Sequence, residues 1–95
     1  MDASNYVIRK ALVTLAIEEV LTDVNMVVLE EVKRRLYKNY KCYIPDCFDN
    51  PQYLKDVLEE LYGNSHWTII ESVTKKLSEF DRQKEISSFL TVICR

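Results

Sequence analysis

The chain of 95 residues contains one glycine and two prolines, which is very few for its length. An all-β domain needs a turn about every 8–12 residues, and glycine and proline supply many such turns. Their scarcity therefore excludes most all-β architectures and predicts an all-α fold. A length of 95 residues also leaves room for only one small domain with a single core.

No charge of either sign dominates, because 13 Lys and Arg face 15 Asp and Glu, for a net charge of −2. Such a chain has no general attraction to nucleic acid or to an anionic membrane. No apolar run approaches the ~20 residues of a membrane span. The start, MDAS, lacks the pattern of a signal peptide. We therefore expect a cytoplasmic protein without a membrane partner.

Potential metal ligands and nucleophiles are scarce, since the chain has one histidine, His66, and three cysteines, Cys42, Cys47 and Cys94. An odd number of cysteines without an export signal predicts free thiols, although a bridge between Cys42 and Cys47 stays open if the source is a hyperthermophile. Structural zinc needs four ligands, usually as two pairs. No second pair follows Cys42 and Cys47, so Asp46 or Asp49 would have to complete the set. We expect neither a metal nor another cofactor.

Two other sites could involve His66. Cys47 and His66 could act as nucleophile and base, but no third group that would orient them is recognisable. His66 and Trp67 open a predicted helix, whose free N–H groups could bind an anion. The segment lacks the glycine-rich loop and lysine of a phosphate cradle. We therefore expect no enzyme activity, and we expect Trp67 to lie in the core.

Apolar residues recur at helical spacing and predict four or five helices in one small bundle-like or orthogonal domain. The first helix is expected over residues 4–21, with Ser4 as its N-cap. It is apolar on two sides: Ile8, Leu12 and Leu15 form one, and Val13, Ile17 and Val20 form the other. The second helix is expected over residues 25–39.

Helix signals are sharpest in the second half of the chain. Asn50-Pro51 predicts a helix start, and Gly63 predicts the end of the same helix. A fourth helix follows, capped by Asn64 or Ser65. Its predicted core stripe is Trp67, Ile70, Val73, Leu77 and Phe80.

A second apolar stripe, Ile86, Phe89, Leu90 and Ile93, follows the charged run 81–85. We therefore divide the chain into a helical domain, 1–80, and a helical extension, 81–95. The extension either folds back over the core or continues outward and exposes its stripe. Monomers seldom tolerate an exposed apolar face, and each buried side chain contributes about 1.5–3 kcal/mol. The stripe thus predicts a homodimer interface, and the apolar first helix is a second candidate contact.

The segment KRRLYKNYKCY, residues 33–43, interleaves three tyrosines with five cations: Lys33, Arg34, Arg35, Lys38 and Lys41. Single-stranded nucleic acid is bound by surfaces of this composition. The structural alternative is a helix end stabilised by cations, with Arg34 and Arg35 paired to Glu30 and Glu31 four residues earlier. An acidic protein partner is a further possibility. Nearby acids weaken the positive field, so nucleic-acid binding is the alternative hypothesis.

The layout resembles the NitrOD5 domain, a small archaeal output domain. The likeness rests on IRKALVTLAIEEVL (8–21), LEEVKRRLYKNYKCYIPDCFDNPQYLKDVLEELYG (29–63) and IIESVTKKL (69–77). It extends to Phe80, and the tail 81–95 lies beyond the usual end of the family. The resemblance implies a non-enzymatic interaction module in signalling or transcriptional regulation, and it carries no catalytic residue.

Overall fold

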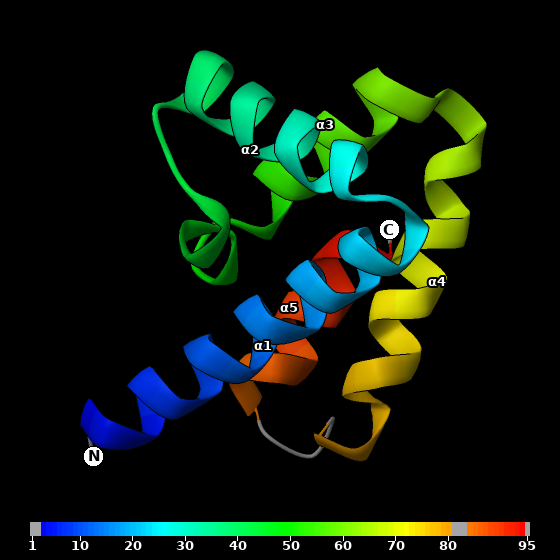
Figure 1. Cartoon of the computed structure of the whole chain (residues 1–95). Coiled ribbons are helices and arrows are strands. Elements are labelled where there is room, and N and C mark those ends of the chain that lie inside the picture. The colour runs from blue at the N-terminus through cyan, green and yellow to red at the C-terminus, as the bar shows by residue number, and fades with distance from the viewer. Residues whose placement is uncertain (1–2, 81–83, 95) are drawn as a thin grey trace.

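A computed structural model describes residues 3–80 and 84–94 and confirms the all-α fold (Figure 1). No β-strand occurs in these ranges. The five α-helices are α1 (Ala3–Val24), α2 (Met26–Tyr40), α3 (Pro51–Tyr62), α4 (His66–Leu77) and α5 (Lys84–Ile93). Three short 3-10 segments join them: η1 (Ile44–Phe48), η2 (Gly63–Ser65) and η3 (Ser78–Phe80).

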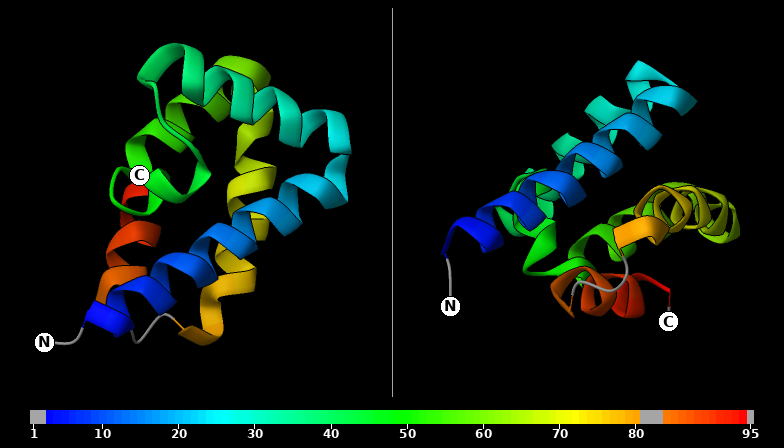
Figure 2. Two further views of the ribbon diagram at one scale, coloured as in Figure 1. Left: turned by 60° about the vertical axis from the view of Figure 1, so that its left-hand side comes forward. Right: turned by 90° about the horizontal axis from the view of Figure 1, so that it is seen from below.

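Helix α1 is the longest element and runs along one edge of the molecule (Figures 1 and 2). At its C-terminal end the chain turns sharply into α2, and the two helices form a V that η1 closes. Helices α1 and α3 both contact α2, η1, α4 and α5. The first turn of α1 extends beyond the other helices (Figure 2).

One core lies inside these elements, and every α-helix contributes to it. Helix α1 buries one of its two apolar sides completely, since Val13 and Leu21 are 0% exposed. The other side, with Ile8 and Leu15, faces solvent. Burying a side chain removes apolar area from water, so the buried side of α1 holds the fold together.

Helix α5 folds back, so the predicted dimer interface on its stripe is corrected. Ile86, Phe89 and Ile93 are at most 1% exposed, and Leu90 packs partly buried against the same core. Side chains already covered by their own chain offer no apolar face to a second copy. Helix α4 ends at Leu77. Residues 81–83 of the charged run lie outside the described part of the chain.

The helix ends follow local rules in most places. Asn25 caps α2, its Oδ1 accepting the Val27 N–H at 2.8 Å. Pro51 opens α3, and Gly63 ends it with φ +55°, a conformation that glycine adopts most easily. The predicted cap Ser4 is wrong, because α1 already begins at Ala3. Ser65 precedes α4 but makes no side-chain capping bond.

The start of α4 also corrects the predicted core. His66 is 3% exposed and Trp67 is 43% exposed, so the histidine faces inward and the tryptophan outward. The reason is local: Nδ1 of His66 lies 2.6 Å from the carbonyl oxygen of Gly63, which satisfies one ring nitrogen inside the turn. The Trp67 ring rests on the His66 ring instead, with centroids 4.4 Å apart, and Lys55 Nζ lies 5.6 Å from its centroid.

The burial of α5 predicts that Ile86→Ala lowers the free energy of unfolding by about 2–5 kcal/mol, because a buried isoleucine leaves a cavity. Ile8→Ala is the matched control, since Ile8 is 55% exposed, and its cost should be well under half as large. Urea denaturation at low protein concentration measures both. Equal losses would contradict the folded-back position of α5.

Candidate interaction surface

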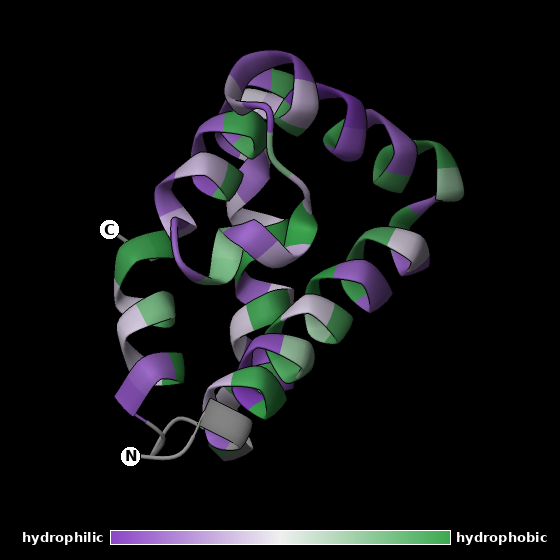
Figure 3. Ribbon diagram, turned by 90° about the vertical axis from the view of Figure 1, so that its left-hand side faces the viewer, coloured by the Kyte–Doolittle hydropathy of each residue, from purple (hydrophilic) through white to green (hydrophobic). Residues whose placement is uncertain are grey.

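The outward side of α1 forms a continuous apolar face. It consists of Val7, Ile8, Ala11 and Leu15, which we call the α1 outer face. Residues three, four and seven apart lie on the same side of a helix. Val7, Ile8 and Leu15 are 60%, 55% and 53% exposed. Hydrophobic ribbon segments recur along α1 in Figure 3. Scattered exposed apolar residues are ordinary, whereas a face shared by four of them indicates a contact surface.

Polar contacts on both flanks hold the first half of α1 in place. The Tyr6 hydroxyl donates to the Asp49 carboxylate, with oxygens 2.6 and 2.7 Å away, and Lys10 Nζ lies 3.1 Å from Asp49 Oδ2. These hydrogen bonds raise the pKa of both Tyr6 and Lys10. On the other flank, Arg9 pairs with Glu85 of α5 at 2.9 Å. The α1 outer face therefore points away from the body of the molecule.

Charges along α1 run against its helix dipole. The cations Arg9 and Lys10 lie in its first half, and the acids Glu18, Glu19 and Asp23 lie in its second half. Acids stabilise the N-terminal end of a helix and cations its C-terminal end. Glu19 is paired with Lys76 at 3.4 Å. Glu18 and Asp23 have no ion-pair partner among the described residues, so their charge remains available to another molecule.

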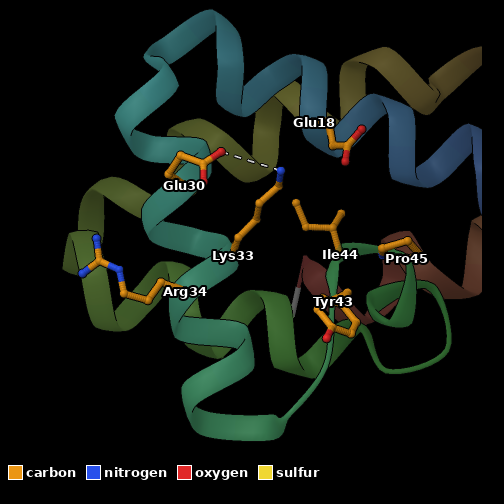
Figure 4. Close-up of a pocket in the computed structure, with 7 residues that line it drawn as sticks. All are labelled: Glu18, Glu30, Lys33, Arg34, Tyr43, Ile44 and Pro45. Carbon is orange, nitrogen blue, oxygen red and sulfur yellow. Dashed lines mark ion pairs between the residues drawn. The ribbon is translucent and has the colours of Figure 1, made fainter.

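A groove of about 500 Å³ lies between α1, α2 and the start of η1 (Figure 4). It is lined by Glu18 of α1, by Glu30, Lys33 and Arg34 of α2, and by Tyr43, Ile44 and Pro45. Lys33 reaches toward Glu30 at 3.7 Å, whereas the Arg34 guanidinium points away from Ile44. Side chains of both charge signs thus surround an apolar floor. This arrangement suits contact with a protein surface that has both polar and apolar groups, rather than the binding of a single charged ligand.

The structure divides the basic segment 33–43 among several surfaces. The predicted pairing four residues apart is wrong: Arg34 pairs with Glu31 at 2.8 Å and Arg35 with Glu60 of α3 at 2.9 Å. Hydrogen bonding from Arg35 lowers the pKa of Glu60. Helical spacing explains the split, because consecutive residues point about 100° apart around the helix. The segment therefore presents no single surface of five cations.

Two cations of the segment remain unpaired among the described residues, namely Lys38 and Lys41. Lys41 Nζ lies 5.1 Å from the centroid of Tyr37, whose ring lies 5.7 Å from that of Tyr43. Both tyrosines are exposed. Tyr40, in contrast, stacks on Tyr53 with centroids 4.1 Å apart and faces inward. The exposed basic and aromatic cluster is thus smaller than the sequence predicts.

The thiols and the histidine form no joint site. Cys42 and Cys47 are free and buried, and burial raises the pKa of both, most strongly that of Cys47. Cys94 is free and exposed. Nε2 of His66 lies 3.5 Å from Glu59 Oε2, so the polar neighbours of the ring are Glu59 and Gly63 rather than Cys47. The described residues contain no group of three side chains suited to a metal.

Comparisons with family models, curated proteins and solved structures found no match to this chain. The resemblance to the NitrOD5 domain therefore stays a prediction. Within residues 3–80 and 84–94, no helix combines the length and the hydropathy that crossing a bilayer requires. Because the comparisons give no functional information, the functional proposal rests on the α1 outer face.

The buried thiols predict a loss of stability at alkaline pH. An unfolded thiol titrates near a pKa of about 8.5, whereas burial keeps Cys47 protonated well above that pH. The unfolded state releases a proton that the folded state retains, so the free energy of unfolding falls as the pH rises above about 8.5. Urea denaturation across pH 7–10 should show that the free energy of unfolding falls less steeply with pH in Cys47→Ala than in the wild-type protein. Cys94→Ala is the control and should keep the wild-type slope; identical slopes in all three proteins would contradict the prediction.

Proposed function

We propose that the protein is a non-enzymatic interaction module that associates with a second copy of itself through the α1 outer face. The observation that carries this proposal is the exposure of Val7, Ile8 and Leu15 on one side of a helix whose other side is fully buried. Because water contacts this apolar area only in the monomer, covering it favours association. Signalling or transcriptional regulation is the process that the family resemblance implies.

The expected dimer is weak. Full burial of such a side chain contributes about 1.5–3 kcal/mol, and each of these three is already partly covered. A two-fold interface contains these side chains from both copies, so the apolar burial supplies roughly 5–10 kcal/mol. Association costs about 4–15 kcal/mol in lost freedom. The two ranges overlap, and the polar groups that surround the α1 outer face therefore decide the affinity.

The chemistry of the described residues supports a binding role over an enzymatic one. Cys47 is buried with a raised pKa, which disfavours the nucleophilic thiolate. His66 is buried against a backbone carbonyl. Its remaining polar neighbour is Glu59, and no nucleophile lies among its hydrogen-bond partners within residues 3–80 and 84–94. A catalytic site needs a nucleophile, a base and an orienting group within reach of one another.

A second exposed apolar patch lies at the corner between α1 and α2, formed by Val24, Met26 and Val27. These side chains are 55%, 61% and 71% exposed. The corner is formed by only three residues at a helix junction, so it provides a shorter contact than a helix face does. We therefore assign self-association to the α1 outer face and use the corner as its control.

Leu15→Glu should abolish the dimer, since it places one carboxylate from each copy within the apolar contact. Light scattering at concentrations from micromolar to millimolar should show a dimer for the wild-type protein and a monomer for Leu15→Glu. Val27→Glu adds the same charge at the corner and should leave the dimer unchanged. A monomeric wild-type protein across this range would contradict the proposal, and dissociation by Val27→Glu alone would move the contact to the corner.

Nucleic-acid binding remains a second candidate, favoured by one observation: Lys38 and Lys41 form no ion pair among the described residues, and Lys41 lies over the ring of the exposed Tyr37. On this alternative, a fluorescent single-stranded oligonucleotide binds at low salt. Two phosphate contacts give a slope of about −1.4 in a plot of log affinity against log salt. Lys38→Glu with Lys41→Glu should remove the binding, whereas Lys75→Glu with Lys76→Glu on α4 should keep it. Absence of binding at low salt would reject this alternative.

A further inference from the structure

We infer that two copies pair through antiparallel α1 helices, with Ala11 next to the two-fold axis. This inference rests on the proposed self-association and adds its geometry. Val7 and Ile8 lie four and three residues before Ala11, and Leu15 lies four residues after it. In an antiparallel pair centred on Ala11, Val7 and Ile8 of each copy therefore meet the partner's Leu15. The contact is self-complementary, as a two-fold interface must be.

The size of Ala11 suits a position at the crossing point. Packed helices have axes about 8–10 Å apart, and small side chains at the contact permit the shorter distance. Ala11 is exposed and lies between larger apolar residues on the same face. A close approach there brings the flanking side chains of both copies into contact. A larger residue at the centre would hold Val7 and Leu15 apart.

The charge order of α1 selects the antiparallel direction. Pairing residue 11 with residue 11 brings Glu18 opposite residue 4, in the first turn of the partner helix. That turn carries unpaired backbone N–H groups and the positive end of the dipole. Glu18 has no ion-pair partner within the described part of its own chain. A parallel pair would instead place Glu18 and Glu19 beside the same acids of the partner.

The groove beside α1 extends the contact. Glu18 forms one end of the groove whose floor includes Ile44 and Pro45. The first turn of the partner helix, which projects beyond the other elements in Figure 2, would lie over this end. Tyr43, which also lines the groove, is 63% exposed and adds apolar area to the contact. The interface therefore exceeds what the four residues of the α1 outer face supply.

A cysteine at position 11 tests the axis directly. A disulfide requires Cα atoms about 4.4–6.8 Å apart, which two copies satisfy only where their helices cross. Ala11→Cys, in a background with Cys94→Ser that removes the exposed thiol, should form a covalent dimer under air with a copper catalyst. Thr22→Cys in the same background is the control. An antiparallel pair places residue 22 beyond the start of the partner helix, so it should remain monomeric on a non-reducing gel.

The outcomes separate the geometry from the proposed function. Crosslinking of both variants indicates a parallel pair. Crosslinking of neither variant, in a protein that light scattering shows to be a dimer, rejects the crossing of the two helices at Ala11. Either result overturns the inference and leaves self-association in place. A protein that is monomeric by light scattering overturns both.

A charge reversal tests the direction independently. Glu18→Lys should weaken the dimer by about threefold to tenfold, because a cation then lies at the positive end of the partner helix. Asp23→Lys is the control, since residue 23 lies beyond the partner's first turn and the reversal should leave the dissociation constant unchanged. Sedimentation at several concentrations measures the constants. A tighter dimer with Glu18→Lys would contradict the antiparallel direction.

Discussion

The burial of one side of α1 is the constraint on which the rest of the structure depends. α1 contacts α2, η1, α4 and α5, and it buries Val13, Ile17 and Leu21 almost completely. Because its neighbours lie on that side, none of the described elements covers the opposite side. The same packing that creates the core thus leaves the α1 outer face in water.

The folded-back α5 completes this arrangement. Its buried stripe fills the space between α1 and α3, and the ion pair between Arg9 and Glu85 ties it to the first half of α1. An apolar stripe on a terminal helix can cover its own core or a second copy with similar gain, because the hydrophobic effect is not directional. Here an intramolecular contact wins, since it lacks the translational cost of association. The proposed interface moves to α1 as a result.

Local signals explain why much of the fold was predictable. The scarcity of glycine, the Asn50-Pro51 start and the Gly63 end depend on backbone preferences that act within a few residues. Such local signals did not predict which residue at the start of α4 is buried in the core. His66 and Trp67 are adjacent, and the hydrogen bond from the His66 ring to the Gly63 carbonyl decided which of them entered the core. Hydropathy alone favours the tryptophan.

The sequence by itself determined the helical class, the turn positions and the apolar character of both sides of α1, because helical period and turn chemistry are local properties. Only the tertiary structure decided which side of α1 is buried and which cations of segment 33–43 share a surface. Those outcomes depend on contacts between residues far apart in the chain, such as Arg35 with Glu60 and Tyr6 with Asp49. A repeating pattern identifies an apolar side, but it does not say which element will cover it.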